Sequence, residues 1–326
     1  MLVLATFLML AAQTAPTPRS MALTFDDLPY ADVNLGGEDA LPRAQRATAA
    51  LLRALVSHRA PAVAFVNDAI LLSGREVEAR ITLLQQWVNA GAILGNHTFS
   101  HADFNTMTVE KFEAEIVMGE LFTRPLMKPR QPYTLYFRYP RTHTGDTKRK
   151  KKVIEEFLAT RGYKIAPHTI DSSDFIFNAA FVRARISSDE ATAIRIRAAY
   201  LDFVISATQF AERISPRIFG REIPQTILLH ANDLNADCLD ELLSRLEARG
   251  YQFIPLDAAM ADPAYQTRDT LVTSFGPTWL WRWMKSLGMT VSFSDDPEPP
   301  EWVKQLLNPA TRTAPPRPGS HHASAR

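Results

Sequence analysis

Two pairs of side chains in the first third of the chain have the residue types and spacing of a metal site. Asp26 and Asp27 are adjacent and follow an apolar run, and His97 and His101 stand four residues apart after another. Two imidazole nitrogens and one carboxylate oxygen suit a borderline cation such as Zn²⁺ and leave positions open for water and substrate. If a helical turn begins at His97, both imidazoles face the same way. Taken alone, however, adjacent aspartates are more typical of a helix cap or a turn.

Three further segments carry polar groups at predicted strand ends. They are residues 138–141 (Arg-Tyr-Pro-Arg), residues 171–175 (Asp-Ser-Ser-Asp-Phe) and His230. Each is weak by itself, since a single histidine at the end of a strand is more often structural than catalytic. Parallel β/α folds nevertheless place their active sites at the carboxyl ends of the strands, so all five segments are predicted to meet at one edge.

The elements that must position these groups alternate between short apolar runs and longer amphipathic segments, which is typical of a parallel β/α architecture. The expected strands are 21–25, 62–66, 92–94, 135–138, 164–166, 225–229 and 251–254. The expected helices are 44–56, 81–90, 109–122, 151–160, 186–213 and 234–249. This many consecutive units favour a barrel.

The order of the five segments resembles that of the polysaccharide deacetylase family, also called the NodB-homology family or carbohydrate esterase family 4. Its members carry T-F-D-D, H-[ST]-x-x-H, R-x-P, D-x-x-D-W and L-x-H, and the first, second and fifth patterns are matched without departure at 24–27, 97–101 and 228–230. The resemblance covers about residues 21–260. It implies an α/β fold that is a distorted (β/α) barrel of seven or eight strands.

The resemblance also implies the site. Asp27, His97 and His101 would bind a divalent metal, for which Zn²⁺ is favoured, although the spacing does not separate it from Co²⁺ or Ni²⁺. Asp26 would be the general base that takes a proton from water. His230, as an imidazolium, would be the general acid that protonates the departing amine.

Further roles follow from the same resemblance. Arg138 would tether the carboxylate of Asp26 and keep it ionised. An aspartate of the fourth segment, for which Asp171 is favoured, would orient the general acid. The backbone N–H of Arg141, after Pro140, would lie in the oxyanion site.

Two residues depart from the family pattern. Phe175 replaces the usual Trp of the fourth segment, and Arg141 follows Pro140 where an aromatic residue often stands. Neither change removes a catalytic atom, but both reshape the wall of the groove. They put the usual sugar substrates of the family in doubt.

The implied function is metal-dependent hydrolysis of acetyl groups from an N-acetylated carbohydrate, such as peptidoglycan or a chitin-like oligosaccharide, with release of acetate. Three alternatives stay open: an O-acetyl esterase of the xylan type, a non-sugar C–N amidohydrolase, and a non-catalytic carbohydrate-binding relative. A protein of the last kind has no need for Asp26 and His230 together.

Composition sets the context. The chain has 326 residues, 46% of them hydrophobic, and a net charge of +1, so no global field favours nucleic acid as a partner. Residues 1–20 are expected to be a signal peptide and linker without a basic start, which indicates a periplasmic or secreted protein with no stable membrane span. Residues 21–260 would be the catalytic domain, 261–307 an extension packed on the barrel, and 308–326 a disordered tail.

Three weaker features have two interpretations each or no assigned function. The basic residues 148–152 favour a solvated loop before a helix, or else a landing site for an anionic polymer. Trp279, Trp281 and Trp283 favour packing of the extension over a sugar-stacking platform. Cys238 is the only cysteine, which excludes an intrachain disulfide, and its helical surroundings indicate a half-buried apolar role.

Overall fold

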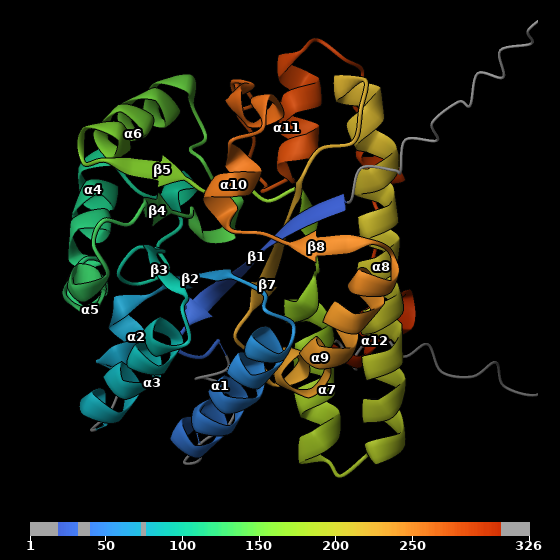
Figure 1. Ribbon diagram of the computed structural model, residues 1–326. Helices are drawn as coiled ribbons and strands as arrows, with labels where there is room; N and C mark the ends of the chain where they lie inside the picture. Colours follow the sequence, from blue (N-terminus) through green and yellow to red (C-terminus); the bar gives the residue numbers. More distant parts are fainter. Residues whose placement is uncertain (1–18, 32–39, 73–75, 308–326) are drawn as a thin grey trace, which may run out of the picture.

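One parallel sheet organises the computed structural model, which describes residues 19–31, 40–72 and 76–307 (Figure 1). Its strands are β1 (Arg19–Leu28), β2 (Ala62–Val66), β3 (Ile93–Asn96), β4 (Leu135–Phe137), β5 (Tyr163–Ile165), β6 (Ile170–Asp171), β7 (Gln225–His230) and β8 (Tyr251–Phe253). They run in the order β5-β4-β3-β2-β1-β7-β6, and β8 pairs with the first three residues of β1. Because every pairing is parallel, the carboxyl ends of the strands share one edge.

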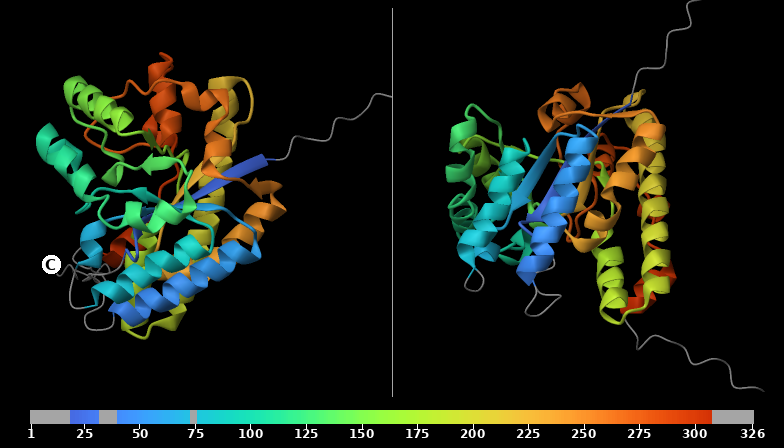
Figure 2. Two further views of the ribbon diagram at one scale, coloured as in Figure 1. Left: turned by 60° about the vertical axis from the view of Figure 1, so that its left-hand side comes forward. Right: turned by 60° about the horizontal axis from the view of Figure 1, so that its bottom comes forward.

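Twelve α-helices among the described residues surround this sheet. They are α1 (Ala40–Ser57), α2 (Asp68–Leu71), α3 (Val77–Asn89), α4 (Val109–Met118), α5 (Thr123–Met127), α6 (Lys148–Thr160), α7 (Asp174–Ile186), α8 (Glu190–Phe219), α9 (Asp233–Ala248), α10 (Leu256–Met260), α11 (Trp279–Ser286) and α12 (Glu301–Leu307). The views in Figure 2 show the sheet curling between helices. The described strands β5 and β6, at the two ends of the order, are not paired with each other. The predicted α/β class and distorted barrel are confirmed.

The burial of the strands explains why they could be predicted from the sequence. All five residues of β2 are buried, as parallel strands covered on both faces require. On β1, Phe25 packs against Trp87 of α3 with ring centroids 5.2 Å apart. The buried residues of α1, among them Ala44, Leu51 and Leu55, recur at helical spacing and turn one stripe toward the sheet.

Several boundaries differ from the prediction. The helix expected at 186–213 is α8, but it begins four residues later than predicted, because Asp189 caps it by accepting a hydrogen bond from the Thr192 backbone N–H at 3.0 Å. Helix α7, which ends at Ile186, was not predicted. The basic residues 148–152 are not a loop: they form the first turns of α6, where Thr147 Oγ1 caps the helix by accepting from Lys150 N–H at 3.1 Å. Lys151 is buried.

The C-terminal extension, residues 261–307, packs against helices of the barrel. Helix α11 lies against α8, and α12 lies against α7. Trp279, Trp281 and Trp283 are only 6%, 1% and 1% exposed, so they contribute to the core and form no open sugar platform. Cys238 is buried and donates a hydrogen bond to the Leu234 carbonyl.

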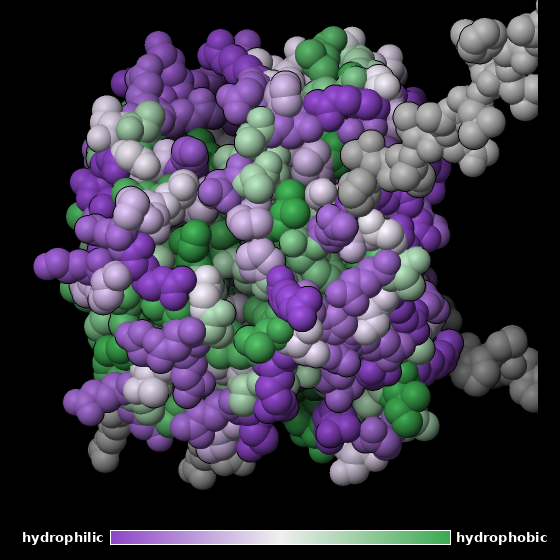
Figure 3. Space-filling view, viewed as in Figure 1, coloured by the Kyte–Doolittle hydropathy of each residue, from purple (hydrophilic) through white to green (hydrophobic). Residues whose placement is uncertain are grey.

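The two predicted terminal segments fall largely outside the described residues, so the leader and the tail stay predictions. Strand β1 begins at Arg19, two residues earlier than the expected domain start. No helix in the described part of the chain is both long and apolar enough to cross a membrane. The face seen in Figure 3 is mainly hydrophilic, with small separate hydrophobic areas, which is usual for a surface in contact with water.

Candidate metal centre and catalytic site

Asp27, His97 and His101 meet at the carboxyl edge of the sheet. One ligand atom from each lies within 4.8 Å of the others. Asp27 Oδ1 is 3.6 Å from His97 Nε2 and 3.6 Å from His101 Nε2. The residues come from the end of β1 and from the loop after β3, two strands that both border β2.

These three donors fit a divalent cation. Two ligands bound to one tetrahedral Zn²⁺ at about 2.1 Å lie about 3.4 Å apart, close to the spacing found here. Among the described residues, no group donates a hydrogen bond to the buried Asp27 Oδ1. Burial alone would raise the pKa of Asp27, yet the charges of His101, His230 and His97 outweigh it and lower this pKa. An anionic oxygen without a donor therefore faces two imidazoles.

His97 is held in the tautomer that a metal ligand needs. Its Nδ1 lies 2.9 Å from the Arg138 carbonyl oxygen, which can only accept, so Nδ1 carries the proton and Nε2 keeps its lone pair. Burial lowers the pKa of His97, which favours the neutral ring. The Asn67 side chain donates to the His97 carbonyl at 2.6 Å and fixes the backbone at the same point.

The helical turn expected at His97 does not form. Residues 97–101 are a bent loop in which Thr98 and His101 have left-handed backbone angles, with φ of 65° and 58°. Asn96 Oδ1 accepts from Thr98 N–H at 2.8 Å, and Thr98 Oγ1 accepts from Ala102 N–H at 3.0 Å. The loop rather than a helix aims the two imidazoles, whose ring centroids are 5.2 Å apart.

Asp26 lies beside the three donors and pairs with Arg138. The side chain of Asp26 is almost fully buried, and its Oδ1 is 3.6 Å from Arg138 Nη1. Arg138 is 0% exposed, donates to Thr24 Oγ1 at 3.0 Å, and stacks 4.7 Å above the Phe65 ring. Asp26 Oδ2 is 3.7 Å from His97 Nε2, so this carboxylate borders the candidate metal position.

His230 reaches the same place from β7, where it lies in register with Asp26 of β1. Its Nε2 is 3.9 Å from Asp27 Oδ2, and its Nδ1 is 2.6 Å from Asp174 Oδ1. Burial alone would lower the pKa of His230, but Asp174 and the other nearby carboxylates raise it to about 10. The ring is therefore a proton donor at neutral pH.

The partner of His230 is Asp174, so the expectation of Asp171 in that contact is wrong. Asp174 is 0% exposed and begins α7, and its Oδ2 also accepts from the His230 backbone N–H at 2.7 Å. Asp171 ends β6 and accepts from Ser173 N–H at 2.7 Å. Because Ser173 has a left-handed φ of 47°, the chain turns and sends Asp174 rather than Asp171 toward the histidine.

The segment after β4 forms a tight turn next to these groups. Pro140 is buried, Arg141 and Thr142 have φ of 56° and 57°, and Thr142 N–H donates to the Tyr139 carbonyl at 3.0 Å. Arg141 has an exposed side chain, whose charge helps to lower the pKa of Asp27. Phe175 is 56% exposed, with its ring centroid 6.3 Å from that of His230.

Sequence reasoning missed a second histidine–carboxylate pair near the site. His143 Nδ1 is 2.8 Å from Asp103 Oδ1, and both side chains are mostly buried. Burial would raise the pKa of Asp103, but the hydrogen bond to His143 and the charge of Arg141 lower it. The only sequence signal was proximity to the second and third segments, since Asp103 follows His101 by two residues and His143 follows Arg141 by two.

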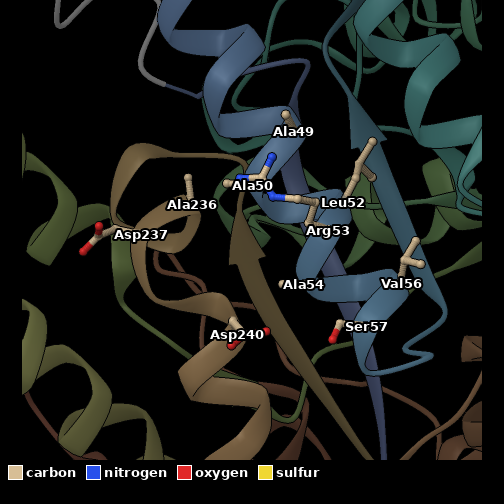
Figure 4. Close-up of a pocket in the computed structure, with 10 residues that line it drawn as sticks. All are labelled: Ala49, Ala50, Leu52, Arg53, Ala54, Val56, Ser57, Ala236, Asp237 and Asp240. Carbon is tan, nitrogen blue, oxygen red and sulfur yellow. The ribbon is translucent and has the colours of Figure 1, made fainter.

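A separate hollow of about 750 Å³ lies between α1 and α9 (Figure 4). Small apolar residues such as Ala50, Ala54 and Ala236 line it, together with Arg53 and Asp240. None of the site residues described above borders it. The reactive groups of this protein are thus gathered at the strand edge and not in this hollow.

The first three of the five segments lie within a match to a known family. The family model described as polysaccharide deacetylase matches residues 13–157. An uncharacterised 30.6 kDa protein from the fumA 3′ region of Geobacillus stearothermophilus is 26% identical over 203 residues, which are 62% of this chain and 63% of that protein. The chain thus spans less than two thirds of the length of this relative.

Similar solved structures include three from bacteria. BA3943 of Bacillus anthracis, a CE4 family pseudoenzyme, is 16% identical with a TM-score of 0.45 over 76% of this chain and 66% of that one. The peptidoglycan deacetylase PdaC of Bacillus subtilis is 19% identical with a TM-score of 0.45 over 78% and 96%. A family 4 carbohydrate esterase of Streptomyces lividans in complex with acetate is 18% identical with a TM-score of 0.45 over 74% and 95%.

Proposed function

We propose that this chain, whose residues 13–157 match the family model of polysaccharide deacetylases as its motifs predicted, is a metal-dependent hydrolase that removes acetyl groups from an N-acetylated carbohydrate. Peptidoglycan or a chitin-like oligosaccharide is the substrate class, and acetate is released. We further propose that the protein acts on this polymer outside the cytoplasm, in keeping with the apolar leader at residues 2–12.

One observation carries the proposal. The donors of Asp27, His97 and His101 face one point, and a buried carboxylate and a protonated imidazole border it. A carbohydrate-binding protein gains nothing from burying Asp26 and charging His230 at the same place, since both cost desolvation free energy. Hydrolysis of an amide needs both a base and an acid.

The three donors would hold the cation, for which the imidazole and carboxylate set favours Zn²⁺. When bound there, it would act as a Lewis acid toward the acetyl group and toward water. The orientation of His97 by the Arg138 carbonyl and of the loop by Asn96 prepares the donors without the cation.

The other groups of the chain then have separate tasks. Asp26 accepts a proton from the water that adds to the acetyl carbon, and Arg138 Nη1, 3.6 Å away, compensates its charge. The C–N bond breaks as His230 gives its Nε2 proton to the departing nitrogen, so that a neutral amine and acetic acid leave. The acid ionises to acetate in water, and the proton taken up by Asp26 returns to His230 before the next cycle. The Arg141 backbone N–H, in the turn after β4, would donate to the oxygen of the tetrahedral intermediate.

The protonated state of His230 favours an amide over an ester as the bond that is cleaved. An amine is a far poorer leaving group than an alcohol, so only the amide depends strongly on a proton donor. Asp174, fully buried and 2.6 Å from His230 Nδ1, keeps that donor charged. N-deacetylation is therefore the reaction that this arrangement supports best.

The test is acetate release by the purified chain, stripped with a chelator and then supplied with Zn²⁺, Co²⁺ or Ni²⁺. Substrates are N-acetylglucosamine oligomers, peptidoglycan fragments and acetylated xylan, with free amines measured in parallel. We expect metal-restored release from an N-acetylated substrate, and a fall of about 100-fold or more in kcat for His230→Ala. The matched control is His58→Ala, whose histidine pairs with Asp240 and Glu247 of α9, away from the site.

Two results would contradict the proposal. Stoichiometric binding of Zn²⁺ without acetate release from any substrate would favour a non-catalytic binding protein or a non-sugar amidohydrolase. Release from acetylated xylan alone would instead assign an O-acetyl esterase.

A further inference from the structure

We propose that Arg282, in the C-terminal extension beyond the segment that matches the family, is a positioning residue for the active site. It holds the turn 140–144, and with it the backbone N–H of Arg141, in place. The kinetic consequence of this inference rests on the proposed function, whereas its structural consequence does not.

The turn itself is in an unfavourable backbone conformation. Arg141 and Thr142 are consecutive non-glycine residues with φ of 56° and 57°. A left-handed conformation is unfavourable for a residue with a side chain, and it persists only where the surroundings hold it. The hydrogen bonds of Thr142 N–H and His143 N–H to Tyr139 and Pro140 lie within the turn, so they do not fix it to the rest of the fold.

Arg282 supplies an outside restraint on Thr142 and Thr144, in addition to the pair of His143 with Asp103 and the hydrogen bond from Lys151 Nζ to Thr144 Oγ1 at 3.3 Å. Its guanidinium is 0% exposed and donates from Nη2 to the Thr142 carbonyl at 2.8 Å and from Nη1 to Thr144 Oγ1 at 3.1 Å. The same side chain donates from Nε to the Pro277 carbonyl at 3.1 Å and pairs through Nη1 with Asp269 Oδ2 at 3.0 Å. One buried guanidinium therefore joins two parts of the extension, at Asp269 and at residues 277–282, to the turn.

The backbone of the extension also touches the turn. A Cβ atom on Gly276 would lie 2.0 Å from the Arg141 carbonyl oxygen and 2.7 Å from Thr142 Cβ. Thr273, three residues earlier, accepts a hydrogen bond from Asn105 Nδ2 at 3.3 Å. Only a residue without a side chain allows this approach, so Gly276 gives a second way to disturb the same turn.

The experiment uses three variants of the full chain. Arg282→Gln removes the guanidinium, Gly276→Ala pushes on the turn with Arg282 intact, and Trp281→Phe is the matched control. Trp281 lies in the same helix, is equally buried, and donates to Asp296 at 3.0 Å. Each protein is measured for amide hydrogen exchange of the peptide 139–145, for bound Zn²⁺, and for kcat and KM of acetate release.

We expect exchange of this peptide to rise at least tenfold in Arg282→Gln and Gly276→Ala and to stay unchanged in Trp281→Phe. In the first two variants kcat should fall about 10- to 100-fold, with KM within about twofold and the bound Zn²⁺ unchanged, because a misplaced N–H affects the transition state most. A role in stability alone would lower the amount of folded protein without this separation of kcat from KM.

Unchanged exchange of the peptide 139–145 in the folded variants would overturn the inference, whatever their activity. If Arg282→Gln does not fold, Gly276→Ala decides in the same way. If the wild-type chain releases no acetate, the proposed function fails, and the exchange data still decide whether the extension holds the turn.

Discussion

Replacing Asp174 by asparagine should narrow the pH range in which the protein works. Asp174 is buried, and its Oδ1 lies 2.6 Å from His230 Nδ1. Asparagine keeps the shape and an acceptor oxygen but removes the negative charge. Without that charge, the pKa of His230 falls from about 10 toward the usual 6.5, because burial is then opposed only by the weaker effects of Asp27 and Asp26.

The size of the effect follows from the fraction of His230 that carries its proton. At pH 8, a group with a pKa of about 10 is about 99% protonated, whereas one with a pKa of 6.5 is about 3% protonated. For Asp174→Asn we therefore expect kcat/KM to fall by about 30-fold or more at pH 8, and by less at pH 6. A divalent cation at Asp27 lowers the pKa of His230 in both proteins, so the difference between their pH profiles carries the prediction.

The assay is the pH dependence of acetate release between pH 5 and 10 for wild type, Asp174→Asn and Asp171→Asn. Asp171→Asn is the matched control, because an amide oxygen at that position can still accept from Ser173 N–H. The basic limb of its pH profile, where activity falls as the pH rises, should stay near that of the wild type. Equal displacement of the basic limb in both variants, or a displacement only in Asp171→Asn, would refute the assignment of Asp174 as the partner of His230.

Three further outcomes are expected. His97→Ala and His101→Ala should each abolish stoichiometric Zn²⁺ binding in calorimetry, and retained binding in both would place the metal elsewhere. Burial raises the pKa of Asp68 to about 7, so in the folded protein this carboxyl keeps a proton that it loses above about pH 4 in the unfolded chain. The free energy of unfolding should therefore fall as the pH rises from about 4 to 7. In urea unfolding, Asp68→Asn should raise this free energy by about 1–3 kcal/mol at pH 8 and leave it unchanged at pH 3.5. Gly95→Ala should lower the free energy of unfolding by about 1–3 kcal/mol in the same experiment, because its Cβ would lie 2.5 Å from the Phe65 ring that stacks on Arg138. An unchanged urea midpoint would show that Phe65 can move aside freely.

The elements with the strongest apolar runs were predictable, and those shaped by tertiary contacts were not. Residues 62–66 were predicted as a strand and are β2, because a strand buried on both faces is a continuous apolar run. Strand β6 has only two residues, too few for any periodic signal. The start of α8 depends on the capping hydrogen bond of Asp189, which lies inside the range predicted as helix.

The meeting of the site residues was predictable for a similar reason. Parallel strands bring their carboxyl ends to one edge, so groups that follow different strands come together even when they are more than 100 residues apart in the sequence. The identity of the aspartate beside His230 was not predictable, because Asp171 and Asp174 both stand at the junction of β6 and α7. The left-handed turn at Ser173 decides between them, and serine gives no sign of it. The contact of Arg282 with Thr142 could not be predicted from the sequence either. The two residues are 140 positions apart, and Arg282 belongs to none of the motifs.

The same turns show how the fold positions its chemistry. Six of the eight non-glycine residues with positive φ in the described part of the chain belong to the site segments: Asp27, Thr98, His101, Arg141, Thr142 and Ser173. In three of these turns a polar side chain bonds to the left-handed residue itself: Asn96 to Thr98 N–H, Asp171 to Ser173 N–H and Arg282 to the Thr142 carbonyl. Asp171 accepts a hydrogen bond within the turn that directs Asp174 at His230. We therefore expect Asp171→Leu, which removes the acceptor, to displace the basic limb of the pH profile as Asp174→Asn does, whereas Asp171→Asn should not.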